Sequence, residues 1–211
     1  MKLTVLGATG GVGRQIVTRA LAEGHKVTAA VRNPARLGIE HASLEVVRAD
    51  ALDADSLREV VDGAEAVLSG MGQAGRTDPL KPASTSARAA VEAMNATGVR
   101  RLVVVSAAPL NRTGAGQSWF THKVVTPLLW AALRELYDDL AVMEQILRDS
   151  GLDWTAVRPP RLTNGSAKGT HRHAVEAGPA GITISRADVA RAMLDFVTVR
   201  ETFGHAVGVS N

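Results

Sequence analysis

At 211 residues, with 45% hydrophobic side chains, the chain is long and apolar enough for one globular domain, and intrinsic disorder is not expected. The absence of cysteine excludes disulfides and thiolate metal sites, and a net charge of +3 from scattered arginines indicates no nucleic-acid surface. No apolar run approaches the ~18 residues of a membrane span. A strand pattern follows Met1 so closely that no signal peptide is expected. We therefore expect a cytoplasmic protein, a monomer or homodimer, without membrane or nucleic-acid partners.

The first predicted element is a strand, Lys2–Leu6, that runs directly into a glycine cluster. The cluster has the spacing Gly7-x-x-Gly10-x-x-Gly13, and a helical pattern begins within it. Gly7 and Gly10 would let the backbone turn sharply and approach a pyrophosphate, and Gly13 would let the helix pack closely on the strand. The positive end of the helix dipole would then face the phosphates. This order predicts a dinucleotide-binding turn; a glycine-rich turn without a ligand is the alternative.

The second predicted strand, residues 25–31, ends in basic residues. Rossmann proteins that prefer NAD place an acidic side chain here, where it accepts a hydrogen bond from the ribose 2′-OH. In this chain Arg32 follows the strand, and Arg36 comes one helical turn later. A guanidinium binds a 2′-phosphate that a carboxylate would repel, so NADP(H) is the predicted cofactor. The alternative is that Arg32 is an ordinary solvated loop residue.

Strand and helix patterns continue to alternate along the chain, which predicts a doubly wound parallel sheet, the Rossmann α/β fold, in a single domain. Strands are predicted at 43–47, 64–69, 101–106 and 153–158, and helices at 55–62, 84–97, 127–149 and 189–199. The run at 101–106 lacks alternation, which indicates a strand buried on both faces. A capping box at Ser185–Asp188 precedes the last helix, and residues 205–209 are expected to form a final edge strand.

Two further segments, approximately 111–130 and 163–182, are expected to form a small cap on the substrate side. The first contains Trp119 and Phe120, which either cover the site or simply fill the core. The second contains His171 and His173, which we interpret as surface loop histidines, because no third ligand at a fixed spacing indicates a metal site.

Several motifs together resemble one family. They are GATGGVG at 7–13, VRNPARL at 31–37, ADALD at 49–53, LSGMG at 68–72, VVVSAA at 103–108, SGLDWTAVRPPRLTNG at 150–165 and ISRADVARAML at 184–194. This set is similar to the atypical short-chain dehydrogenase/reductases, in particular to the NAD(P)H-binding, flavin-reductase-like group that includes biliverdin reductase B. The NmrA-like sensors are more distant kin.

The resemblance implies a row of cofactor contacts. It places Asp50 and Ala51 near the adenine, although Asp50 also fits a turn or helix cap. It places Pro159 and Pro160 against the nicotinamide, since their stiff backbone can lie against a flat ring. The other implied cofactor contacts are Thr9, Gly11, Val12, Met71, Gly72, Gln73, Ser106, Ala107 and Leu162.

The proton donor of ordinary family members is missing. They use a Tyr-x-x-x-Lys pair, in which the lysine lowers the pKa of the tyrosine. Here Tyr137 is the single tyrosine, and Ala141 stands four residues later. Ser106, at the position of the family's catalytic serine, is therefore expected only to orient the nicotinamide or the acceptor. Arg161 stands where the resemblance to biliverdin reductase B would place a histidine, and it is a second candidate near the reacting groups.

A flavin does not need such a proton donor, because its reduction requires mainly proximity and the stacking of two flat rings in a dry slot. These features predict an NADPH-dependent oxidoreductase whose acceptor is a flavin, a quinone or a similar flat conjugated molecule. The alternative is a non-catalytic NADP(H) sensor of the NmrA-like type. An epimerase or ketoreductase is disfavoured by the missing Tyr-x-x-x-Lys pair.

Overall fold

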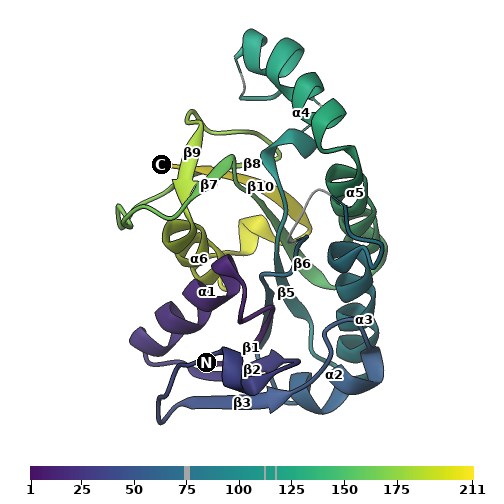
Figure 1. Ribbon diagram of the computed structural model, residues 1–211, viewed down its shortest axis with the longest axis vertical. Coiled ribbons are helices and arrows are strands. Elements are labelled where there is room, and N and C mark those ends of the chain that lie inside the picture. The colour runs from purple at the N-terminus through teal and green to yellow at the C-terminus, as the bar shows by residue number, and fades with distance from the viewer. Residues whose placement is uncertain (74–76, 112, 117) are drawn as a thin grey trace.

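The computed structural model describes residues 1–73, 77–111, 113–116 and 118–211 as three layers, with one sheet between two layers of helices (Figure 1). From one edge to the other, the eight strands are β3 (Leu44–Arg48), β2 (Lys26–Val31), β1 (Lys2–Leu6), β4 (Ala66–Ser69), β5 (Arg101–Val105), β6 (Asp153–Arg158), β10 (His205–Ser210) and β8 (Arg172–Val175). Every neighbouring pair is parallel except β10 with β8. The predicted doubly wound sheet is therefore confirmed.

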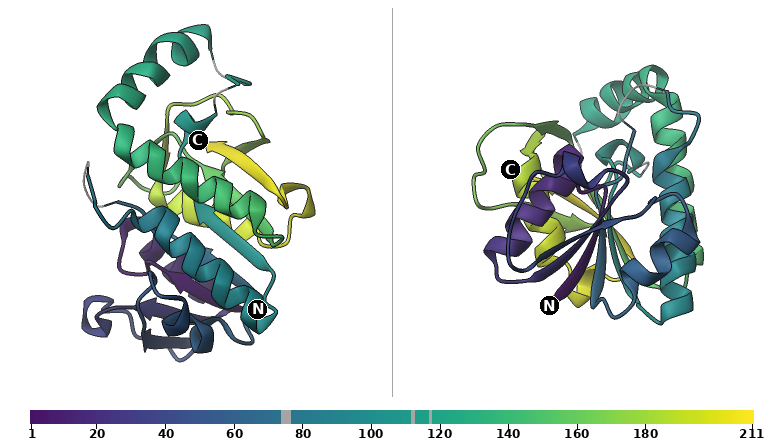
Figure 2. Two further views of the ribbon diagram at one scale, coloured as in Figure 1. Left: turned by 90° about the vertical axis from the view of Figure 1, so that its right-hand side faces the viewer. Right: turned by 60° about the horizontal axis from the view of Figure 1, so that its bottom comes forward.

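Helices cover both faces of the sheet (Figure 2). One face carries α1 (Gly11–Ala22) and α6 (Arg186–Asp195), and the other carries α2 (Ala54–Val61), α3 (Pro82–Thr97) and α5 (Arg134–Asp149). The strand β5 shows the consequence for packing. Val103 and Val105 join the core beneath α1 and α6, whereas Leu102 and Val104 join the core beneath α2, α3 and α5. The prediction of a strand buried on both faces is confirmed.

A second, smaller sheet brackets the 163–182 segment. β7 (Arg161–Thr163) pairs in parallel with β9 (Thr183–Ser185), and β9 leads directly into α6. Ser185 caps that helix, since its Oγ accepts a hydrogen bond from the Asp188 backbone N–H at 3.0 Å. The predicted capping box is present, although α6 begins at Arg186 rather than at 189.

Two predictions for the C-terminal half are wrong. The helix expected at 127–149 is divided into α4 (Thr126–Ala132) and α5, and a π-helical turn (Thr121–Val125) precedes α4. Leu133, between α4 and α5, has non-helical angles (φ −130°, ψ 35°). This division lets α4 project beyond the sheet (Figure 1). The final strand β10 is not at an edge, because residues 172–175, expected as loop, form β8 beside it.

Candidate active site

The glycine turn after β1 is built by two glycines that no other residue could replace without strain. Gly7 has φ +72°, a left-handed conformation that side chains disfavour. A Cβ at Gly13 would lie 2.1 Å from the Gly7 carbonyl oxygen. The Gly10 N–H closes the turn by donating to the same oxygen at 2.9 Å. The structure thus shows the close approach of helix and strand that the sequence predicts at Gly13.

The start of α1 is left open by this turn. Its N-cap residue is Gly10, which has no side chain to cap the helix, and its first turn contains no acidic residue. The first N–H groups of a helix have no partner within the helix, and together with the helix dipole they favour an anion. The end of β4 lies close by, since a Cβ at Gly70 would be 2.7 Å from the Gly13 nitrogen.

A groove of about 220 Å³ begins at this turn and runs across the carboxyl ends of β1, β2 and β4. Among the residues predicted to bind cofactor, it brings together Gly7, Thr9, Gly10, Arg32, Asp50, Ala51, Met71 and Gly72. The other residues of its lining were not predicted to bind cofactor; they are Ala30, Val31, Ala49, Leu52, Gly70, Asp78, Leu80 and Pro82. The groove lies where the strand order reverses between β1 and β4, which is where open α/β sheets bind their ligands.

At the far end of the groove, Arg32 is exposed, and no carboxylate within the described ranges pairs with it. Asn33 caps a short 3₁₀ turn, η1 (Pro34–Arg36), by accepting from the Ala35 N–H at 3.2 Å. Arg36 ends that turn and does not line the groove. Of the two arginines that follow β2, Arg32 therefore lines the groove and Arg36 does not.

Asp50 has the structural role that the sequence left open. Its Oδ1 accepts the Leu52 N–H at 3.0 Å, and its own N–H donates to the Ser56 Oγ at 2.9 Å. The cap of α2 is a different residue, Asp53, which accepts from the Asp55 N–H at 3.1 Å. Asp50 therefore closes its own turn while lining the groove, so the two interpretations of this residue are compatible.

Gln73 lies where the chain leaves β4 for the 73–82 loop. Its Oε1 is buried, and no described residue donates a hydrogen bond to it. A buried acceptor without a donor is costly, and a ligand group that donates would satisfy it. Residues 74–76 of this predicted loop lie outside the described ranges.

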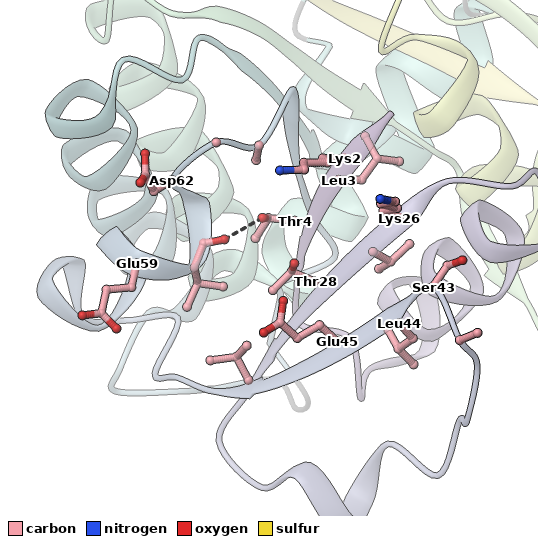
Figure 3. Close-up of a pocket in the computed structure, with 16 residues that line it drawn as sticks. Lys2, Leu3, Thr4, Lys26, Thr28, Ser43, Leu44, Glu45, Glu59 and Asp62 are labelled. Carbon is pink, nitrogen blue, oxygen red and sulfur yellow. Dashed lines mark hydrogen bonds between the residues drawn. The ribbon is translucent and has the colours of Figure 1, made fainter.

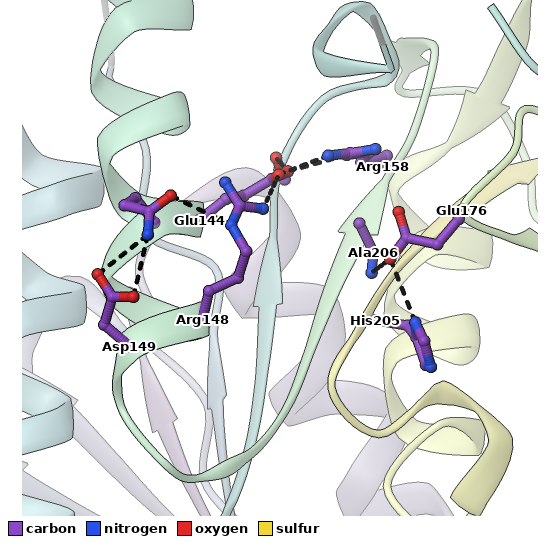
Figure 4. A network of polar contacts seen from close by, with 9 residues as sticks. Glu144, Arg148, Asp149, Arg158, Glu176, His205 and Ala206 are labelled. Carbon is purple, nitrogen blue, oxygen red and sulfur yellow. Dashed lines mark hydrogen bonds and ion pairs between the residues drawn. The ribbon is translucent and has the colours of Figure 1, made fainter. Parts of the chain in front are cut away.

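Glu144 and Arg158 form a buried polar network that the sequence did not predict (Figure 4), and Ser106, directly after β5, is hydrogen-bonded to it. The Ser106 Oγ donates to Glu144 Oε1 at 2.7 Å. Arg158 holds the same carboxylate with two hydrogen bonds, Nε to Oε1 at 2.9 Å and Nη2 to Oε2 at 2.5 Å. Glu144 is only 1% exposed. Arg148, closer to solvent, makes a longer contact with it at 3.6 Å. The Ser106 proton is therefore committed to Glu144, and its oxygen remains free to accept.

One signal in the sequence could have revealed Glu144. It comes four residues after Leu140 and three before Leu147, which puts it on the apolar stripe of α5. A carboxylate on a buried stripe requires a partner. Arg158, at the end of a buried strand, is the matching cation.

The other predicted residues of the nicotinamide side lie outside the groove. Ala107 packs against the α3 and α5 core, and Leu162 against the α1 and α6 core. The Pro159 carbonyl accepts from the Ala108 N–H at 2.9 Å, which ties the double proline to the loop after β5. Arg161 is exposed in β7. Pro160 is partly buried. Gly11 and Val12, the remaining predicted cofactor contacts, form the first turn of α1 and also lie outside the groove lining. The Val12 side chain is in the core.

Tyr137 is not placed to act as an acid. It is buried against Trp130, with ring centroids 5.3 Å apart, and burial raises the pKa of its phenol. Trp119 and Phe120 are 73% and 59% exposed, so the interpretation of these two as core residues is wrong. Trp130, by contrast, does help to fill the core: it is partly buried there and donates to the Pro109 carbonyl at 2.9 Å.

The two predicted cap segments meet each other. The Gly178 N–H donates to the Ala115 carbonyl at 2.9 Å, and a Cβ at Gly116 would lie 2.2 Å from the Gly178 oxygen. This backbone contact joins the 111–130 and 163–182 segments within their described parts. Residues 112 and 117 lie outside the description.

The histidine pair matches the expected surface loop in part: His171 precedes β8 and is half-buried, and His173 is exposed but belongs to a strand. His173 lies in β8, and the His171 and His173 rings both pack edge-on against Phe196, at 5.6 and 5.2 Å between centroids. Burial lowers the pKa of His171, although Asp195 at 3.8 Å opposes this. In the described ranges, no group of three or more His, Cys, Asp or Glu side chains is arranged to hold a metal ion.

A larger hollow, of about 530 Å³, lies at the opposite, amino-terminal end of the sheet (Figure 3). Its rim carries exposed side chains of both signs: Lys2, Lys26, Glu45, Glu59 and Asp62. It contains none of the predicted site residues and lies away from the start of α1. We therefore take the smaller groove as the candidate site, because it contains the glycine turn and Arg32, whereas the larger hollow contains neither.

Residues 7–199 match a family model described as NAD(P)H-binding. The chain belongs to this NAD(P)H-binding family. Its cofactor class, predicted from the glycine turn, is thereby confirmed, and so is its resemblance to the atypical short-chain dehydrogenase/reductases. Among the described helices, none combines the length and apolarity needed to cross a bilayer.

Relatives of this NAD(P)H-binding chain include several reductases. It is 32% identical, over 74% of its own length and 46% of the relative's, to a (4-alkanoyl-5-oxo-2,5-dihydrofuran-3-yl)methyl phosphate reductase of Streptomyces griseus. It is 25% identical to a candidate NADH-flavin reductase from Streptococcus pneumoniae, with a TM-score of 0.79 over 100% and 99% of the two chains. The chain spans about half of the length of the curated relatives that it matches above 30% identity (61% and 46%).

The fold is also that of a short-chain dehydrogenase/reductase from Veillonella parvula that was solved in complex with NADP. The TM-score is 0.82 over 100% and 94% of the two chains, at 21% identity. This likeness is one of fold.

Proposed function

We propose that the chain is an NADPH-dependent reductase whose hydride acceptor is a flavin, a quinone or another flat conjugated ring. The observation that carries the proposal is the pairing of an NAD(P)H-binding family with a site that has no tyrosine acid. Tyr137 is buried against Trp130, and its pKa is raised rather than lowered. An acceptor that spreads charge over a conjugated ring does not require proton donation from such a group.

When bound, NADPH supplies the hydride, and the residues of this chain bind and orient it. The groove-lining Gly7, Gly10 and Thr9 would hold the pyrophosphate, and Arg32 the 2′-phosphate. The donor-free Pro159–Pro160 backbone would support the nicotinamide. Ser106, whose proton is donated to Glu144, would accept a hydrogen bond from the nicotinamide or the acceptor.

Two relatives support a conjugated acceptor. The Streptomyces relative is named as a reductase of a 5-oxo-2,5-dihydrofuran, a ring in which a carbonyl is conjugated to a C=C bond. The Streptococcus structure is named as a candidate flavin reductase. Both acceptor types fall within the class that we propose for this chain.

The deciding experiment follows NADPH absorbance in the near ultraviolet after addition of flavin mononucleotide, a quinone or an unsaturated lactone. Sustained oxidation that depends on the acceptor supports the reductase. Tight binding of NADPH without oxidation by any of the three would overturn it and favour the alternative, a redox sensor that reports to a protein partner.

We predict that NADP(H) binds more tightly than NAD(H) and that Arg32→Ala removes this preference. Loss of a charge-assisted contact with the 2′-phosphate should weaken NADPH binding by about 1.5–3 kcal/mol and leave NADH binding unchanged. Calorimetric titration of both cofactors checks this. Arg36→Ala is the matched control, because Arg36 does not line the groove. A wild type without preference, or a variant that keeps it, contradicts the assignment.

We predict that Ser106→Ala lowers acceptor turnover by about tenfold or less. A neutral hydrogen bond contributes roughly 0.5–1.5 kcal/mol, and about 1.4 kcal/mol is a factor of ten. Steady-state kinetics with NADPH and a flavin measure the effect. A loss of about 10²–10⁴-fold is the range for a proton-transferring group, and it would refute the orienting role.

A further inference from the structure

The side chain of Arg186, the first residue of α6, lies across the start of α1. A Cβ at Gly11 would be 2.7 Å from the Arg186 Nε and 2.8 Å from its Cδ. The arginine therefore occupies the space that a side chain at position 11 would need. Gly11 differs in this respect from Gly13, whose close neighbours are all backbone atoms of the turn.

Arg186 is held in this position from two sides. The helices α1 and α6 share one core, in which Val12 and Ile16 join Val189 and Met193. On the other side, the Arg186 Nη1 donates to the Asn164 Oδ1 at 2.6 Å, directly after β7. Most of its guanidinium donors remain unused, because Asn164 supplies a single neutral acceptor.

Within the part of the chain that the structure describes, the positive charge at this point has no counter-ion. No carboxylate of the described residues forms an ion pair with Arg186. Asp188, two residues along, is committed elsewhere: it accepts from the Lys168 and Gly169 N–H groups, both at 3.0 Å, and from the Ser185 hydroxyl at 2.8 Å. Burial acts to raise the pKa of Asp188, but these donors outweigh it and hold that pKa below its usual value.

A guanidinium and the positive end of α1 thus lie side by side at Gly11, one residue beyond Gly10, which lines the candidate groove. Two positive groups in contact repel unless an anion lies between them. The groove runs from this point towards Arg32 and Asp50, which are on the adenine side. Arg186 approaches from the opposite side, that of β7 and the double proline.

We infer that Arg186 is a second phosphate-binding arginine of the cofactor site, and that glycine at position 11 is required to admit it. Arg186 would bind the pyrophosphate on the side of the nicotinamide, whereas Arg32 would bind the 2′-phosphate on the adenosine. This inference rests on the placement of NADPH in the groove given under the proposed function. A guanidinium matches a phosphate through two parallel hydrogen bonds.

The test compares two ligands that differ in the relevant phosphate. NADPH contains both phosphates of the pyrophosphate, whereas 2′,5′-ADP lacks the one next to the nicotinamide ribose. Arg186→Ala should weaken NADPH binding by about 10- to 100-fold, the range for loss of a charge-assisted hydrogen bond, and 2′,5′-ADP binding by less than about twofold. Arg186→Lys, which keeps the charge but not the fork, should lie between. Arg191→Ala, on the same helix but paired with Asp195, is the control.

A double-mutant cycle tests the role of Gly11. Gly11→Ala alone should weaken NADPH binding by displacing Arg186, and in the Arg186→Ala background it should add less than about twofold. Circular dichroism and thermal unfolding establish that each variant is folded. NADPH affinity of Arg186→Ala within twofold of wild type, equal weakening of both ligands, or additive effects in the cycle would each overturn the inference. The proposed function fails separately, if the wild type does not bind NADPH or if Arg32→Ala weakens neither ligand.

Discussion

Gly10→Val is expected to abolish NADPH binding in a protein that still folds. Gly10 has φ −81° and ψ 169°, which any residue adopts, and a Cβ there would meet only the Gly7 oxygen at 3.2 Å and the Gly70 oxygen at 4.0 Å. The rest of a valine side chain would enter the groove beside the first N–H groups of α1, where the pyrophosphate is proposed to lie. We expect a loss of more than about 100-fold, or roughly 2.7 kcal/mol.

Calorimetric titration with NADPH measures this loss, and circular dichroism reports the fold. Gly13→Ala is the contrasting variant, because its Cβ would lie 2.1 Å from the Gly7 oxygen. That variant should lose stability by about 1–3 kcal/mol or more, since the helix must move away from the strand. NADPH affinity retained in folded Gly10→Val protein would show that the glycine turn is purely structural.

Glu144→Ala is expected to lower the free energy of unfolding by about 3–5 kcal/mol, the range for removing one partner of a buried ion pair. The carboxylate is almost fully buried, and its removal leaves the Arg158 guanidinium in the core without its bidentate partner. Chemical denaturation at neutral pH measures the loss. The control is Arg148→Ala, whose side chain is 47% exposed and contacts Glu144 at 3.6 Å. It should cost less than about 1 kcal/mol.

The double variant Glu144→Met/Arg158→Met separates stability from function. Replacing both partners with apolar side chains should recover most of the lost stability, because no charge is left unpaired. Ser106 would still lack the acceptor that fixes its hydroxyl, so flavin turnover should stay below that of the wild type. A single Glu144→Ala variant as stable as Arg148→Ala would show that the network contributes little to the fold.

The features of the fold and site that could be predicted from the sequence are those determined by residues close together along the chain. Gly7 and Gly13 are needed by a turn of a few residues, and the apolar run at 101–106 must be buried wherever its strand lies. A parallel sheet with helices on both faces follows from the alternation of strands and helices. The groove residues after β1, β2 and β4 follow in turn, because parallel strands end at the same edge.

The parts that could not be predicted depend on residues that meet only in three dimensions. Asp139 on α5 caps the distant helix α3, accepting from the Ala83 and Ser84 N–H groups at 3.0 Å. Arg186 and Gly11 are still farther apart in sequence, and each alone has an ordinary local explanation. The strand β8 was missed because its four residues show too little alternation to distinguish them from loop.

The two outer strands of the sheet also bear on how copies of this chain can associate. Unpaired strand edges invite another strand to add on, and proteins counter this with short edges and charged side chains. Here β8 has four residues and exposes Arg172 and His173, and β3 has five and exposes Glu45 and Arg48. Continuation of the sheet from one copy into the next is therefore disfavoured at both ends. We therefore expect a homodimer, if one forms, to associate through helices or loops rather than through paired strand edges.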